Sequence, residues 1–154
     1  MKLFKLVAVL ALAVSLQAAG TTAQKQFATD LKAEVAKAPT ISPAELMKWI
    51  KEDKKFMLVD IRTSGETSEG VIDADNLKMM QRGKLEFMGI MAGGLKMDDT
   101  IVVYCKAGSR GALATNMLKK YGYKNVYNLT KGTKGWLAAG YPITTSLGEF
   151  TKVK

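Results

Sequence analysis

The sequence predicts an α/β domain in which helices cover both faces of a mostly parallel central sheet. Three apolar runs rich in β-branched or aromatic residues, at 56–61, 100–104 and 126–129, suit buried strands. Segments with helical apolar spacing separate these runs, so strands and helices alternate along the chain. At 154 residues, 47% of them hydrophobic, the chain has room for one core, which we assign to a single domain over residues 40–154.

The first helix of this domain has a strong start signal. Ser42 can cap the helix, Pro43 occupies its first position, and Glu45 is expected to complete a capping box. The charged residues from Asp53 onward end it. Its buried face is predicted to consist of Leu46, Trp49 and Ile50.

The region between the first two strands is less regular. Residues 63–70 are polar and typical of turns, whereas Val71–Ile72 indicate a short strand. Residues 82–91 have helical spacing, and the Gly93–Gly94 pair ends that helix. The helix is expected to contribute to the core Leu85, Phe87, Met88 and Met91.

The last third of the chain predicts two more helices. Residues 109–121 form the first, which Gly122 ends, and residues 130–139 form the second. The buried face of the first is predicted to consist of Leu113, Met117, Leu118 and Tyr121. The second is expected to turn inward Trp136 and Leu137.

The amino terminus has the layout of a secretory signal peptide over residues 1–23. Lys2 and Lys5 precede an apolar run at 6–16, and small residues follow. The run is shorter than the roughly 20 residues that span a bilayer, and a retained anchor is the alternative. An exported protein is therefore expected, in the periplasm where the cell has one, with no membrane attachment after cleavage. Residues 24–39 are predicted to be a linker or a short amphipathic helix.

The composition excludes several kinds of chemistry. The chain has no histidine, so catalytic Ser-His or Cys-His pairs and histidine metal sites are excluded. Its single cysteine cannot form an internal disulfide. No metal site or cofactor is expected. The net charge of +9 suits small anions, whereas nucleic acid is not an expected partner, because no basic run is interleaved with aromatic residues.

The single cysteine, Cys105, directly follows the clearest strand and precedes a helix. Ligands bind beyond the carboxyl ends of parallel strands, and a strand–loop–helix turn directs backbone N–H groups into one concavity. The helix N-terminus, Lys106 and Arg110 add positive charge, and all of these favour a thiolate. A small anion such as thiosulfate is expected to bind at Lys106, Ala107, Gly108, Ser109 and Arg110. The alternatives are a buried, inert cysteine and solvated surface charges.

Residues 105–110 (CKAGSR) resemble the active-site loop of the rhodanese family, C-x-x-G-x-R. Five further segments resemble that family in the right order: 42–46, 59–62, 70–74, 82–87 and 136–142. The resemblance implies a rhodanese-like fold and a thiosulfate sulfurtransferase that carries sulfur as a persulfide on Cys105. The acceptor would be cyanide, a thiol or a protein.

The resemblance also carries expectations for neighbouring residues. By analogy, Asp60 and Arg62 lie at an adjacent strand end, where an ion pair that orders the loop is their expected role. Two positions depart from the family, which commonly has histidine where this chain has Val71 and serine where it has Gly111. Val71 suggests a local packing change. Gly111 suggests the loss of one hydroxyl from the pocket.

Two other functions fit the same pattern. Phosphatases and arsenate reductases of this fold have a longer loop, C-x-x-x-x-x-R, whereas only four residues separate Cys105 from Arg110 here. The second alternative is a non-enzymatic sulfur carrier or interaction module, which would hold a stable persulfide but turn over poorly with free thiosulfate.

Overall fold

A computed structural model describes residues 20–151 of the protein. The described residues divide into two units, the first ending at Ala33 and the second beginning at Glu34. Helix α2 (Thr22–Lys37) begins in the first unit and covers most of residues 24–39, the segment expected to be a linker or a short amphipathic helix. The signal peptide stays a prediction, because residues 1–19 lie outside the described part. No helix between residues 20 and 151 is long and apolar enough to cross a bilayer.

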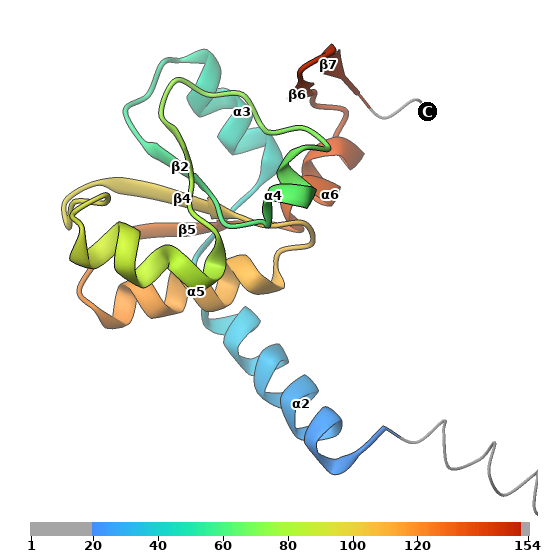
Figure 1. The fold of residues 1–154 in the computed structure, drawn as a ribbon, viewed down its shortest axis with the longest axis vertical. Helices are drawn as coiled ribbons and strands as arrows, with labels where there is room; N and C mark the ends of the chain where they lie inside the picture. Colours follow the sequence, from blue (N-terminus) through green and yellow to red (C-terminus); the bar gives the residue numbers. More distant parts are fainter. Residues whose placement is uncertain (1–19, 152–154) are drawn as a thin grey trace, which may run out of the picture. The chain divides into compact units, whose positions relative to one another are not determined.

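The second unit contains a five-stranded sheet in which every pairing is parallel. Its spatial order is β1-β5-β4-β2-β3, so β4 is the central strand (Figure 1). The strands are β1 (Thr40–Ile41), β2 (Met57–Asp60), β3 (Leu77–Met79), β4 (Thr100–Tyr104) and β5 (Asn125–Leu129). The predicted parallel α/β architecture is confirmed. The sequence did not predict β3, which is a three-residue edge strand.

Helices cover both faces of this sheet (Figure 1). One face packs against α5 (Ser109–Lys120) and the other against α3 (Pro43–Lys51) and α6 (Gly132–Ala138). The short helix α4 (Ser64–Thr67) buries no side chain. Side chains alternate along each strand, so β4 contributes Ile101 and Val103 to one core and Val102 and Tyr104 to the other. The first core includes Leu118 of α5, and the second includes residues of α3 and α6. By the same alternation, Cys105, which follows Tyr104, faces the core that includes Leu118 of α5.

The expected strand at Val71–Ile72 is not present. Val71 forms a single antiparallel bridge with Thr144, in which each residue donates its N–H to the other's carbonyl. Thr144 belongs to a two-stranded hairpin, β6 (Ile143–Thr145) and β7 (Gly148–Phe150). Ile72 is buried as expected of a strand residue, but its N–H bonds the Tyr104 hydroxyl rather than a neighbouring strand. Val71 and Ile72 therefore contribute to packing and to a single bridge rather than to a strand of the central sheet.

The segment predicted as a helix over 82–91 is a 3₁₀ turn, Arg82–Lys84, followed by a π-helix, Glu86–Met91. Leu85 is fully buried, but the prediction was wrong for three other residues. The exposed ones are Phe87, Met88 and Met91. A π-helix bonds residues five apart and has a wider turn than an α-helix, so side chains with α-helical spacing no longer share one face.

Two details of the α-helices also differ from expectation. Of the four residues predicted for the buried face of α5, Leu118 is fully buried, Leu113 and Met117 are half-buried, and Tyr121 is exposed. The other buried residues of this helix are small: Gly111, Ala112, Ala114 and Thr115. In α3, Ser42 caps the helix by accepting the Glu45 N–H, but the Glu45 carboxylate accepts the indole N–H of Trp49. The Glu45 side chain therefore does not complete the expected capping box.

Candidate active site

Cys105 lies at the carboxyl end of the central strand and is only 1% exposed. Its Sγ accepts hydrogen bonds from the backbone N–H groups of Gly108 at 3.2 Å and Gly111 at 3.4 Å. These residues are the N-cap and the third residue of α5. Gly108 has no side chain that could cap the helix, so the sulfur occupies the position of a capping group. The positive end of the helix dipole faces the sulfur, an arrangement that stabilises negative charge placed there.

The backbone of the loop depends on a glycine at position 108. Gly108 has φ +96°, a left-handed conformation in which side chains are strained. A Cβ there would also lie 3.1 Å from the backbone nitrogen of Lys131, at the start of α6. The left-handed turn reverses the chain after Cys105 and brings the first amides of α5 back toward the sulfur.

The first turn of α6 holds the cysteine loop from its other side. The Thr133 N–H donates to the carbonyl of Cys105 at 2.9 Å, and the Lys134 N–H donates to the carbonyl of Lys106 at 3.0 Å. Both carbonyl oxygens therefore point toward α6, and their partial negative charges do not face the sulfur. Gly132 allows this contact, because a Cβ there would fall 2.0 Å from the Cys105 carbonyl oxygen.

The amides of Ser109 and Arg110 are the first two of α5. Within residues 20–151 they have no backbone acceptor, as is usual in the first turn of a helix. With the two amides bound to the sulfur, they form a group of donors at one end of the sheet. Such a group is suited to an anion.

The guanidinium of Arg110 is paired with an acidic side chain from another segment. Its two terminal nitrogens donate to both carboxylate oxygens of Glu66, at 2.8 and 2.6 Å. The hydrogen bonds from Arg110 lower the pKa of Glu66 from 4.5 to about 2. The same hydrogen bonds raise the pKa of Arg110, with smaller contributions from the neighbouring Cys105. The guanidinium therefore lies beside the sulfur but is already paired.

Glu66 is held in place by a capping box in the short helix α4. Thr63 Oγ1 accepts the Glu66 N–H at 3.3 Å, and the Glu66 carboxylate accepts the Thr63 N–H at 3.1 Å. Glu66 is not among the site residues predicted from the sequence. The signal was present, because Thr63-Ser64-Gly65-Glu66 has the spacing of a capping box, but it lies in a segment dominated by turn-forming residues.

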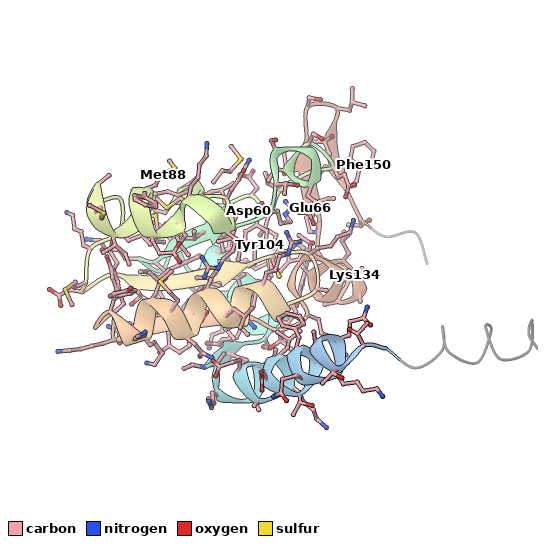
Figure 2. The ribbon with its side chains drawn as sticks, turned by 60° about the horizontal axis from the view of Figure 1, so that its bottom comes forward. Asp60, Glu66, Met88, Tyr104, Lys134 and Phe150 are labelled. Atoms are coloured by element: carbon pink, nitrogen blue, oxygen red, sulfur yellow. The ribbon has the colours of Figure 1, made fainter. Side chains whose placement is uncertain are left out.

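Asp60 and Arg62 form the expected ion pair, at 2.7 Å, with both side chains buried. Arg62 also donates to the backbone carbonyls of Glu66 and Gly70, at 3.0 and 2.7 Å. Although burial alone lowers it, the pKa of Arg62 is raised overall by the bonds to Asp60. Asp60, Glu66 and Tyr104 lie near one another in Figure 2. The pair thus anchors the segment that presents Glu66 to the cysteine loop.

A model of the rhodanese-like domain family matches residues 42–139. The chain belongs to the rhodanese-like domain family. A protein of Allochromatium vinosum named sulfurtransferase is 32% identical over 109 residues, which cover 70% of this chain and 96% of that protein. The probable adenylyltransferase/sulfurtransferase MoeZ of Mycobacterium tuberculosis is 32% identical over 107 residues, 70% of this chain but only 26% of MoeZ. The match thus spans about a quarter of the length of MoeZ.

A solved structure of the polysulfide-sulfur transferase homodimer from Wolinella succinogenes is similar as well. The alignment has 32% identity and a TM-score of 0.66, and it covers 85% of this chain and 91% of that chain. Together these relatives place the rhodanese domain described here in a family of sulfurtransferases.

The other cation of the rhodanese loop is also near an acid. Lys106 Nζ lies 3.6 Å from the Glu69 carboxylate, with the two side chains 46% and 62% exposed. This pair is solvated and contributes little to stability. Ala107 is exposed at the tip of the loop, and Ser109 is half-buried.

The structure explains why glycine occupies position 111 of this chain. A Cβ on Gly111 would lie 2.2 Å from Asn128 Oδ1, so the Asn128 side chain fills the space that a serine would need. Asn128 is buried, and its Oδ1 is one of two buried side-chain atoms without a hydrogen-bond partner in the described part of the chain. The other is Thr115 Oγ1 of α5.

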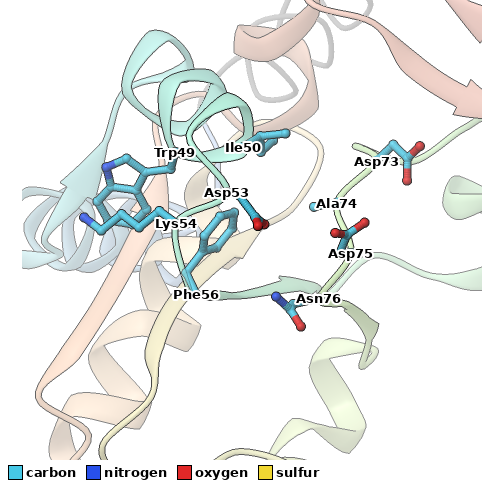
Figure 3. A pocket seen from close by; sticks show the side chains of 9 residues that line it. All are labelled: Trp49, Ile50, Asp53, Lys54, Phe56, Asp73, Ala74, Asp75 and Asn76. Atoms are coloured by element: carbon cyan, nitrogen blue, oxygen red, sulfur yellow. The ribbon is translucent and has the colours of Figure 1, made fainter.

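A separate pocket of about 200 Å³ contains none of the predicted site residues (Figure 3). It lies by the start of β2, away from the carboxyl end of the strands, and is lined by Trp49, Ile50, Asp53, Lys54, Phe56, Asp73, Ala74, Asp75 and Asn76. Its carboxylates do not form a metal site, since residues 20–151 contain no group of three or more His, Cys, Asp or Glu side chains that could hold an ion.

Proposed function

We propose that this rhodanese transfers sulfane sulfur from thiosulfate or a persulfide, through a persulfide on Cys105, to a thiophilic acceptor. The observation that supports this is the Cys105 sulfur at the N-terminus of α5, with the amides of Gly108 and Gly111 directed at it. A cysteine buried among apolar side chains alone would not support the proposal.

The reaction takes two steps. The Cys105 thiolate attacks the outer sulfur of thiosulfate, the S–S bond of the donor breaks, and sulfite leaves with the bonding electron pair. Cyanide or the thiolate of an acceptor then attacks the outer sulfur of the persulfide, and the Cys105 thiolate is released. Each step exchanges one sulfur bond for another, so no external oxidant or reductant is consumed. No general base is required once the nucleophile is ionised, which suits a chain without histidine.

The loop residues have distinct roles in this mechanism. The amides bound to the sulfur, with those of Ser109 and Arg110, would stabilise negative charge on the attacking sulfur and on the persulfide, as an oxyanion hole does. Ala107 and Lys106, both exposed, would form the entrance, and Lys106 would attract the anionic donor.

Cellular context adds to the proposal. Residues 1–23 have the pattern of a signal peptide, so we propose that the protein acts after export, in the periplasm of a cell that has one. The acceptor there would be a small thiol or a protein thiol. The relative from Wolinella succinogenes is named a polysulfide-sulfur transferase, so inorganic polysulfide is a second donor to test.

Mass spectrometry of the intact protein tests the proposal. The protein lacking residues 1–23 is incubated with thiosulfate, with polysulfide or with neither, and is then exposed to cyanide. We expect a gain of one sulfur atom with the donors, its loss as thiocyanate forms, and neither change in Cys105→Ser. A protein that gains no sulfur from either donor would contradict the proposal. A persulfide that forms but is released only slowly would favour the sulfur-carrier alternative over an enzyme.

A further inference from the structure

The contact between Arg110 and Glu66 bears on which donor the site prefers. A forked guanidinium binds a sulfonate or carboxylate through two parallel hydrogen bonds. Here Glu66 already occupies that fork, at 2.8 and 2.6 Å. The sulfonate end of thiosulfate would need the same two donors. Thiosulfate must therefore either displace Glu66 or bind without the arginine.

Glu66 is difficult to displace, because three elements hold it. Its carboxylate accepts from Arg110 and from the Thr63 N–H, while its backbone carbonyl accepts from the buried Arg62. The side chains of Glu66 and Arg110 are 19% and 38% exposed, so the pair lies at the rim of the site and is partly screened by water. Displacement is therefore costly but possible.

The charges around the loop balance. The segment that follows β2 provides Glu66 opposite Arg110 and Glu69 opposite Lys106. The formal charges of these four side chains sum to zero, which removes much of the attraction that two free cations would exert on a dianion. Inorganic polysulfide is itself a dianion and is subject to the same balance of charge, so the two donors are distinguished by the arginine fork. A persulfide or polysulfide has no sulfonate oxygens to place between the two Arg110 nitrogens that Glu66 occupies, and it presents a soft sulfur to the backbone amides.

We propose that Glu66 is a specificity-determining residue that occupies Arg110 and disfavours thiosulfate relative to persulfide-type donors. This inference rests on the proposed sulfur transfer through Cys105. Glu66 touches neither the reacting sulfur nor the donor. It acts through Arg110, and its effect falls on donor affinity rather than on the chemical step.

Steady-state kinetics of Glu66→Gln test the inference, with thiosulfate and inorganic polysulfide as donors and cyanide as acceptor. Glutamine can still accept the N–H of residue 63 in a capping box, so α4 is preserved while the charge-assisted pair is lost. We expect KM for thiosulfate to fall about twofold to fivefold, the range for loss of one partly exposed ion pair, with kcat within about 1.5-fold. KM for polysulfide should change by less than about twofold.

Glu69→Gln is the matched control, because it removes one negative charge from the same segment without touching Arg110. Equal effects of the two variants would show that net charge alone matters and would overturn the inference. So would an unchanged or higher KM for thiosulfate in Glu66→Gln, or a fall in kcat, which would mean that Glu66 holds Arg110 in its working position. Failure of the proposed function is distinguishable, because neither donor would then load sulfur onto Cys105 of the unmodified protein.

Discussion

Gly132 of α6 offers a direct test of how the cysteine loop is held. A methyl group at this position would lie 2.0 Å from the Cys105 carbonyl oxygen, 2.8 Å from its carbonyl carbon and 3.0 Å from the carbonyl carbon of Lys106. All three are backbone atoms, so no side-chain rotation can relieve the contact. The loop must move away from α6, and the hydrogen bond from the Thr133 N–H to Cys105 must lengthen.

Two costs combine in Gly132→Ala. Its φ of +54° is left-handed, which costs a residue with a Cβ about 1–2 kcal/mol. Forcing the loop and helix apart adds roughly 1–3 kcal/mol, the usual range for overpacking. We therefore expect the free energy of unfolding to fall by about 2–5 kcal/mol, the sum of these two ranges. Because the loop must shift, persulfide formation on Cys105 should slow as well.

Gly140→Ala separates the two costs. Gly140 is also left-handed, with φ +85°, but a Cβ there would meet no atom within 4 Å. Urea denaturation of both variants should show a loss of about 1–2 kcal/mol for Gly140→Ala, from backbone strain alone. Persulfide formation, followed by mass spectrometry, should be unaffected in this control. Equal stability losses in the two variants, or normal persulfide formation in Gly132→Ala, would refute the idea that α6 fixes the loop.

Three further outcomes are expected. Gly111→Ser should destabilise the fold because its Cβ meets Asn128 Oδ1, and Asn128→Ala in the same chain should recover stability, so a double-mutant cycle by urea denaturation should give a favourable coupling. Asp60→Asn should cost about 3–5 kcal/mol in the same assay, since it leaves the Arg62 charge buried without its partner. The pKa of Glu66 is lowered to about 2 from 4.5, so its stabilising contribution is complete above pH 4.5 and is lost as the pH falls toward 2. Thermal unfolding of Glu66→Gln should therefore differ from that of the unmodified protein at pH 6, and the difference should shrink toward pH 2.

The features that were predicted correctly are specified by residues close together in the sequence. The run at 100–104 is buried on both faces and reads as one continuous apolar stretch, so its boundaries match β4. Ser109 begins the following helix as predicted. Because Cys105 lies between these two elements, its position at the carboxyl end of the central strand followed from the sequence. The amides that face its sulfur followed from the same geometry.

The features that escaped prediction depend on packing between distant segments. Phe87 and Met91 have α-helical spacing, but a π-helix turns them outward, and no local pattern specifies its five-residue bonding. Gly111 was recognised as a departure from the family, yet its cause is Asn128, on a different strand. Spacing along one segment cannot show what another segment brings to the same volume.

The pairing of Arg110 with Glu66 has the largest functional consequence among these long-range contacts. The motif C-x-x-G-x-R places a cation beside the nucleophile, and by itself it predicts a binding site for an anion. Glu66 lies 44 residues earlier in the chain, held by a capping box and by the buried Asp60–Arg62 pair. The loop motif therefore accounts for the nucleophile and its amides, whereas the segment after β2 governs access to the arginine. In the proposed mechanism, sulfur transfer depends on Cys105 and its amides, whereas donor choice depends on Glu66. A change at Glu66 should therefore alter KM for thiosulfate while Cys105 still accepts sulfur.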